Sequence, residues 1–121
     1  MNYSNLVDSM LAAIPEVRPR FDEGNSWWDE ILPHIVFGDV VVPVVIEWLS
    51  EYQTKNSELI RAFSFFEEMA TSGDKMVEEV LGVTVLEQLG DGRSILQVAR
   101  TFMGNQTREL SDNIEKGLGR M

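Results

Sequence analysis

The sequence predicts an all-α fold, in which a single domain spanning residues 1–121 is built from about six short antiparallel helices. Apolar residues recur at helical spacing in one segment after another, and short breakers rich in Gly, Pro or Asp separate these segments. A chain of 121 residues that is 44% hydrophobic and 25% charged is typical of one globular domain. We therefore expect a helical bundle or a helical-repeat-like packing.

The first helix is predicted to begin at Ser4, because serine is a good capping residue, and to end near Pro15. Apolar residues recur between these two positions at the spacing of one helix face. Residues 15–33 contain three prolines and the pair Gly24-Asn25. We therefore expect irregular chain there, with at most a short turn of helix around residues 27–32.

The segment from Ile35 to Tyr52 is ambiguous between strand and helix. Its run of β-branched residues favours a strand, but Pro43 would remove a hydrogen-bond donor from the middle of that strand. If Asp39 caps a helix instead, Pro43 falls in the first turn, where its missing N–H costs little. We therefore expect a helix, and whether residues 35–46 are helical throughout is left open.

The next two helices are clearer. Ser57 is expected to cap one that ends near Ser72-Gly73 and that turns Glu67 and Glu68 toward solvent. A second helix, capped by Asp74, is predicted to run to residue 89. Because this helix is apolar on nearly all sides, we expect it to be buried between the others.

Two more helices complete the prediction. Gly90-Asp91-Gly92 forms a break, after which Ser94 is expected to cap a helix with a regular apolar stripe that ends at Gly104. Residues 107–118 are predicted to form a weaker and more polar helix.

The composition excludes several functional classes. Twenty Asp and Glu against ten Lys and Arg give a net charge of −10, which argues against direct binding of nucleic acid or of anionic membranes. The absence of cysteine excludes disulfides, thiol nucleophiles and cysteine-ligated zinc. No Lys or Arg precedes Arg18, and the apolar stretch Ile35–Ile46 is shorter than the roughly 20 residues of a bilayer span. We therefore expect a cytoplasmic location.

No residues stand out as catalytic, metal-binding or cofactor-binding. His34 is the single histidine, and Ile31 occupies the position where a di-metal Glu-x-x-His motif needs glutamate. The adjacent pairs Glu67-Glu68 and Glu78-Glu79 point in different directions on a helix, so neither pair converges on one substrate atom. We therefore predict that the protein is not an enzyme and has no cofactor, although a small helical enzyme that uses a carboxylate stays open as a third class.

The distribution of charge favours a protein partner. The first sixty residues contain ten Asp and Glu but three Lys and Arg, and residues 21–54 contain neither Lys nor Arg. The pair Trp27-Trp28 lies in the same stretch, and adjacent tryptophans cannot easily both face one core. Aromatic anchors rimmed by carboxylates suit recognition of a basic protein. The predicted partner-binding residues are Asp22, Glu23, Trp27, Trp28, Asp29, Glu30, Glu47 and Glu51. The alternative is that both tryptophans cap the core and that the acidic residues only keep the chain soluble.

Four segments resemble a family of small bacterial all-α domains, some of which occur in toxin-immunity settings. These segments are residues 33–39 with the following Pro43, Phe65-Phe66-Glu67-Glu68-Met69, residues 84–91 and residues 103–110. In its small size, acidity and single-domain character the chain also resembles contact-dependent inhibition immunity proteins. The resemblance implies a helical fold and carries over no catalytic residues.

The leading hypothesis is therefore an immunity protein that binds and neutralises a cognate toxin, and a basic nuclease is the kind of toxin that an acidic inhibitor suits. The alternative is an acidic cytoplasmic interaction module or subunit that is unrelated to toxins. The sequence does not predict the oligomeric state.

Overall fold

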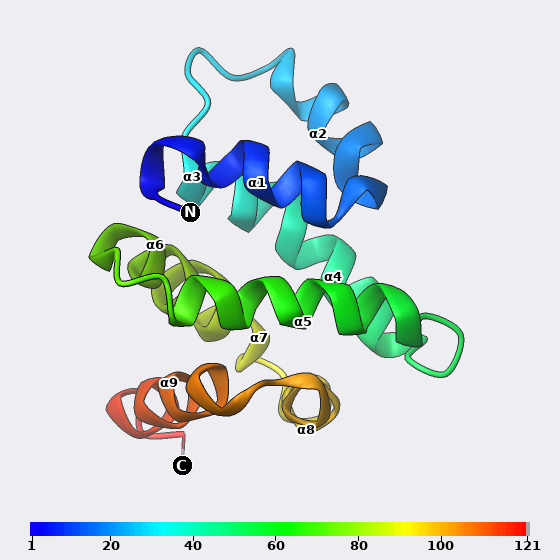
Figure 1. The fold of residues 1–121 in the computed structure, drawn as a ribbon. Helices are drawn as coiled ribbons and strands as arrows, with labels where there is room; N and C mark the ends of the chain where they lie inside the picture. Colours follow the sequence, from blue (N-terminus) through cyan, green and yellow to red (C-terminus); the bar gives the residue numbers. More distant parts are fainter. Residues whose placement is uncertain (121) are drawn as a thin grey trace.

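The computed structural model describes residues 1–120 and contains helices but no strand within that range, which confirms the predicted all-α class (Figure 1). The α-helices are α1 (Leu6–Ala13), α2 (Arg18–Asn25), α3 (Pro33–Val36), α4 (Val42–Ser50), α5 (Asn56–Ala70), α6 (Lys75–Glu79), α7 (Glu87–Leu89), α8 (Arg93–Phe102) and α9 (Asn105–Gly117). Two 3-10 turns, η1 (Tyr3–Asn5) and η2 (Pro15–Val17), and two π-helical segments, η3 (Phe37–Val41) and η4 (Val80–Leu86), lie between them.

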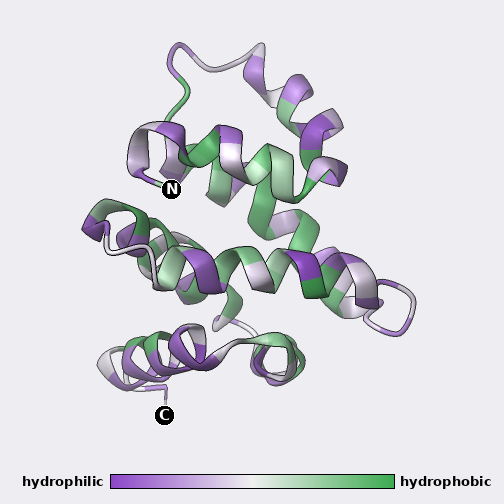
Figure 2. Ribbon diagram, in the orientation of Figure 1, coloured by the Kyte–Doolittle hydropathy of each residue, from purple (hydrophilic) through white to green (hydrophobic). Residues whose placement is uncertain are grey.

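The helices are arranged around α5, which contacts α1, α4, α8 and α9 (Figure 1). Helix α2 lies at one end of the molecule, and α8 and α9 lie at the opposite end. Phe63, Phe65 and Phe66 of α5 are each at most 2% exposed, and burying one such side chain contributes about 2 kcal/mol. In Figure 2, α1 and α4 are mostly hydrophobic, α5 alternates between hydrophobic and hydrophilic residues, and α2 and α9 are mostly hydrophilic.

Helices α3 and α4 are one continuous helix, interrupted by the π-helical segment η3. The helix begins at Pro33, so the prediction that Asp39 caps it was wrong, and residues 35–46 are helical throughout. Pro43 cannot donate a hydrogen bond, and its ring would clash with the carbonyl four residues earlier in a regular α-helix. The wider turn just before it, in which the N–H of Val42 donates to the carbonyl of Phe37, accommodates the ring.

The continuous helix from Pro33 to Ser50 has 18 residues, and its length and apolar composition would allow it to cross a membrane. The sequence analysis did not indicate this, because it considered only the shorter apolar stretch Ile35–Ile46. However, 56% of it is buried inside the fold. Burial of this extent is what a core helix in a water-soluble domain shows, because the apolar faces are already covered by protein.

The region between α1 and α3 differs from the prediction. Helix α2 forms where irregular chain was expected, and residues 27–32 are turn and irregular chain where a short helix was considered. Pro19 lies in the first turn of α2, where proline is well tolerated, and Phe21 is 6% exposed and anchors the helix to the core. The number of prolines in this region was therefore a poor guide, because the position of each proline decides whether a helix can form.

Besides Asp39, three other predicted caps were wrong. Asn2, rather than Ser4, caps the first turn, because its side chain accepts a hydrogen bond from the N–H of Asn5 at 3.1 Å. Ser57 and Ser94 both lie at the second position of their helices and cap neither. Serine at this position is exposed and polar in the same way as a cap, so the sequence pattern alone does not separate the two.

The cap at Asp74 is confirmed. Its Oδ1 accepts hydrogen bonds from the N–H groups of Met76 at 2.9 Å and Val77 at 3.3 Å, and its Oδ2 accepts one from the N–H of Tyr3 at 3.0 Å. The hydrogen bond from Tyr3 and those from the helix N–H groups lower the pKa of the Asp74 carboxyl. The helix it begins is mostly buried as predicted, although Met76 and Val83 are more than half exposed.

Candidate functional site

The two adjacent tryptophans have different environments. Trp27 is 84% exposed, whereas Trp28 is half-buried and packs against Phe21 with ring centroids 5.8 Å apart. Gly24 makes this packing possible, because a Cβ at that position would lie 2.9 Å from the Trp28 ring. One tryptophan is therefore a surface residue, and the alternative in which both cap the core was wrong.

Trp27 and Trp28 line an open hollow of about 410 Å³, which we call the Trp hollow. Its lining residues are Arg20, Glu23, Gly24, Trp27, Trp28, Asp39 and Val40. The hollow therefore brings together three of the predicted binding residues from α2 and the chain after it. It also adds Asp39, which comes from η3 and which the sequence analysis had assigned to a helix cap.

Two of the predicted acidic residues are neutralised by arginines that precede the acidic stretch. Asp22 forms an ion pair with Arg18 at 3.7 Å, and Glu47 forms one with Arg20 at 2.9 Å. Both pairs are exposed, and such pairs contribute little to stability. Their consequence is electrostatic, because the surface around α2 is less acidic than the count along residues 21–54 indicates.

The remaining predicted residues do not all gather at the Trp hollow. Asp29 is exposed in the segment between α2 and α3, and Glu30 lines a separate hollow of about 490 Å³ together with residues of α1. Glu51 follows the end of α4 and lines a third hollow formed by residues 50–55. The candidate partner surface therefore centres on α2 and residues 26–32, and Glu51 lies apart from the Trp hollow.

Exposed apolar side chains are concentrated in the sequence that begins at Trp27, although Ile31 and Leu32 line the same separate hollow as Glu30. Ten large hydrophobic residues are exposed within residues 1–120, and four of them, Trp27, Ile31, Leu32 and Ile35, lie within nine residues of sequence. Their exposed fractions are 84%, 45%, 39% and 37%. Clustering of this kind is typical of an interaction site, whereas single exposed apolar residues need no explanation.

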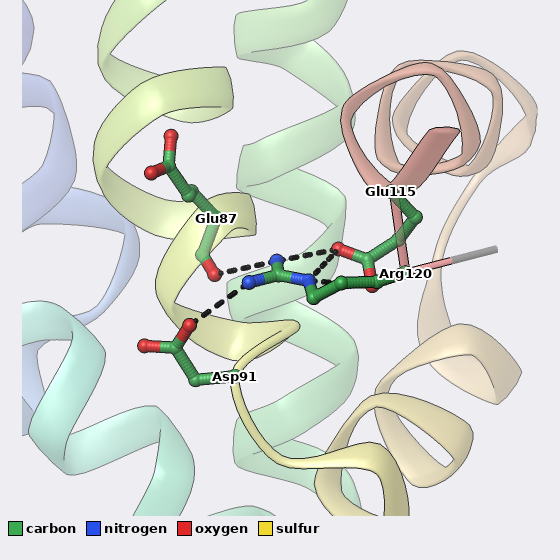
Figure 3. A network of polar contacts seen from close by, with 4 residues as sticks. All are labelled: Glu87, Asp91, Glu115 and Arg120. Carbon is green, nitrogen blue, oxygen red and sulfur yellow. Dashed lines mark hydrogen bonds and ion pairs between the residues drawn. The ribbon is translucent and has the colours of Figure 1, made fainter. Parts of the chain in front are cut away.

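A second polar cluster, which the sequence analysis missed, surrounds Arg120 near the C-terminus. Figure 3 shows its guanidinium between Glu115, Asp91 and the backbone carbonyl of Glu87. The Nη2 atom lies 2.6 Å from Glu115 Oε2, and Nη1 lies 3.0 Å from Asp91 Oδ1. The hydrogen bond to the buried Glu115 raises the pKa of Arg120. Asp91 and Glu87 lie 29 and 33 residues before Arg120 in the chain, so the folded structure is needed to reveal these two contacts.

The Arg120 cluster borders a hollow of about 590 Å³ that is also lined by Arg93, Leu96 and Arg100. Arg100 forms an ion pair with Asp112, so two of the three arginines around this hollow already have carboxylate partners. The cluster therefore fastens α9 to α7 and carries little uncompensated charge for a ligand.

Glu67 has a structural role that corrects its predicted orientation toward solvent. Its carboxylate accepts hydrogen bonds from the N–H of Gln106 at 3.1 Å and from the N–H and the hydroxyl of Thr107, both at 2.8 Å. Burial pushes the pKa of Glu67 upward, but these hydrogen bonds outweigh burial, so the pKa is lowered overall. Glu67 of α5 thus caps the N-terminus of α9.

His34 also has a structural partner. Its Nδ1 lies 2.6 Å from the hydroxyl oxygen of Thr84 and joins α3 to the π-helical segment η4. Within residues 1–120, no group of three or more His, Asp and Glu side chains is arranged to hold a metal ion.

Comparison with known proteins places this chain in a family. It belongs to the family described as Domain of unknown function (DUF7674), whose model matches residues 7–119. No curated protein and no solved structure matches the chain. The inferred resemblance to a family of small domains is confirmed at this level, whereas membership among immunity proteins stays a prediction.

Proposed function

We propose that this member of the DUF7674 family is a cytoplasmic immunity protein, which neutralises a cognate basic toxin, in the simplest case a nuclease, by stoichiometric binding. The observation that carries the proposal is the 84% exposure of Trp27 beside the carboxylates of the α2 surface. In this reading the protein has no catalytic role, and capture of the partner is its whole activity.

A tryptophan at the centre of an interface is a frequent hot spot. Its large apolar surface is removed from water when a partner covers it, and truncation of such a residue often costs 2 kcal/mol or more of binding free energy. Ile31, Leu32 and Ile35, which follow Trp27 in the sequence, are exposed as well and offer further apolar surface to a partner. The carboxylates around them would form the polar rim of the interface.

The charge distribution of the whole chain would orient a basic partner toward this surface. Residues 1–92 contain 17 Asp and Glu against five Lys and Arg, whereas residues 93–121 contain three against five. Helix α2 belongs to the acidic part of the chain and lies at the end opposite to α8 and α9, which belong to the part with a small excess of basic residues (Figure 1). A basic protein is attracted to the α2 end and repelled at the other, which accelerates productive association.

The test of function is co-expression with a toxin encoded beside this gene. We expect cells to survive with the wild-type protein and to die with the Trp27→Ala variant, while the Ile60→Ala variant, which removes an exposed apolar residue of α5, should still protect. Equal killing with and without the wild-type protein would exclude the immunity function.

Association kinetics test the electrostatic part separately. Reversing the charge at Asp29 and Glu30 should slow association and reduce its dependence on salt, because both residues belong to the exposed acidic segment. Unchanged kinetics would remove these two residues from the interface. A pull-down from the native strain that recovers a basic protein with no toxic activity would favour the alternative, an interaction module unrelated to toxins.

A further inference from the structure

We infer that the Trp hollow binds one guanidinium group, the side chain of an arginine on the partner protein. This inference deepens the proposed function and rests on it for the identity of the partner, but the binding site itself can be tested separately. The hollow combines an exposed indole, a half-buried indole and two carboxylates that come from different helical segments.

The charge of the Trp hollow selects a cation. Glu23 and Asp39 form no ion pair with any residue that the structure describes, from residue 1 to residue 120. The basic residue in the lining, Arg20, is bound to Glu47 at 2.9 Å, so its charge is already compensated. Two carboxylates therefore face the hollow without a counter-charge, and an anionic ligand would be repelled.

The tryptophans add a second attraction for the same ligand. The face of an indole ring carries negative charge density and attracts a cation, and tryptophan is the strongest of the aromatic side chains in this respect. Trp28 is fixed against Phe21, with Gly24 leaving room for its ring, so this wall of the hollow is formed before any ligand arrives. Preformed walls reduce the ordering cost of binding.

The arrangement favours guanidinium over ammonium. A guanidinium is planar, stacks on aromatic rings and donates several hydrogen bonds in fixed directions, so it can contact Glu23 and Asp39 while it lies against Trp27. A lysine ammonium is a more strongly hydrated point charge and gains less from the rings. A volume of about 410 Å³ is near the lower end for small-ligand sites and suits one side chain.

The test uses short peptides and NMR of the indole N–H groups. The probes are acetyl-Gly-Arg-Gly-amide, its lysine counterpart and its citrulline counterpart, which keeps the shape of arginine without the charge. We expect the arginine peptide to shift the resonances of Trp27 and Trp28 saturably with a Kd on the order of 1 mM, which is typical of a single contact point. The resonance of Trp48, which is 8% exposed, should not move and reports that the fold is intact.

The other two peptides and the variants give the specificity. The lysine peptide should bind several-fold more weakly, and the citrulline peptide should not shift the resonances. The double variant Glu23→Gln and Asp39→Asn should weaken arginine binding at least tenfold. The matched control Glu30→Gln, which removes a carboxylate outside the Trp hollow, should change it less than twofold. Equal binding of arginine and citrulline, equal binding of arginine and lysine, or an equal loss in the control would each overturn the inference.

The two proposals can fail independently. If the arginine peptide does not bind but co-expression still protects cells, the guanidinium site is wrong and the immunity function stands. If the peptide binds and no toxin is neutralised, the Trp hollow remains an arginine site and the immunity function is wrong.

Discussion

Replacing Glu67 by alanine should destabilise the protein by removing the link between α5 and α9. The Glu67 carboxylate accepts three hydrogen bonds, two from backbone N–H groups and one from a hydroxyl, at the N-terminus of α9. These N–H groups have no partner inside their own helix, because the first turn of a helix leaves its donors unpaired. Loss of the carboxylate therefore affects both the cap and the attachment of the helix.

The magnitude follows from the three contacts. Loss of an N-cap costs about 1 kcal/mol, and a negative charge at a helix N-terminus contributes about 0.5 kcal/mol more. Thr107, whose N–H and hydroxyl both lose a partner, is fully buried, and the added desolvation brings the total for Glu67→Ala to about 2 kcal/mol. Glu67→Gln keeps one acceptor oxygen and should cost about 1 kcal/mol.

The effect should depend on pH with a definite sign. The pKa of Glu67 in the folded protein is below its ordinary value of 4.5, so the ionised carboxylate stabilises the fold at any pH above that value. This contribution is lost as the pH falls through the lowered pKa. The stability difference between wild type and Glu67→Gln should therefore be constant near pH 7 and should shrink below about pH 4.5.

Thermal and urea unfolding followed by circular dichroism measure these differences. A loss of 2 kcal/mol corresponds to a decrease in Tm of roughly 8 °C in a domain of this size. The matched control is Glu68→Ala, which removes the neighbouring exposed glutamate and should change Tm by no more than about 2 °C. An equal effect of the two substitutions, or a Glu67→Gln difference that grows in acid, would refute this account of the cap.

Other substitutions test further contacts by the same unfolding measurements. Ser111→Ala should leave stability unchanged or raise it by up to about 1 kcal/mol, because its buried hydroxyl has no hydrogen-bond partner within residues 1–120; a clear loss would contradict this. Thr84→Val should cost about 1 kcal/mol, since it leaves His34 Nδ1 without its partner. Gly104→Ala would place a Cβ 2.5 Å from the Glu67 carboxyl carbon, so its effect should be less than additive with Glu67→Ala. Arg120→Gln should lower Tm, because Glu115 loses its ion-pair partner, and an unchanged Tm would show that the cluster is not stabilising.

The sequence predicted the fold class and most helices because apolar periodicity is a local signal. It did not predict α2, because a proline is compatible with a helix when it lies in the first turn. The start of α2, and therefore the place of Pro19 in its first turn, depends on the packing of Phe21 against the core, which the sequence does not show. The extent of the helix around Pro43 was missed for a related reason. Its π-helical turn depends on packing that a pattern of residue types does not show.

The candidate site was predicted in part. The adjacency of Trp27 and Trp28 correctly indicated that one of them is on the surface, since two neighbouring side chains cannot share one direction. The sequence could not show that Asp39 joins them, because Asp39 approaches from a different helix. Nor could a count over residues 21–54 show that Arg20, just outside that window, neutralises Glu47.

Two groups of acidic residues in this chain therefore have separable effects. Asp74, Glu67 and Glu115 hold chain ends or helices together through hydrogen bonds and ion pairs. Glu23 and Asp39, at the Trp hollow, form no ion pair with residues 1–120. Neutralising a member of the first group should lower stability and leave the Trp hollow intact. Neutralising Glu23 and Asp39 should leave Tm nearly unchanged, because no contact is lost, so a weaker interaction with a partner can be assigned to the surface rather than to unfolding.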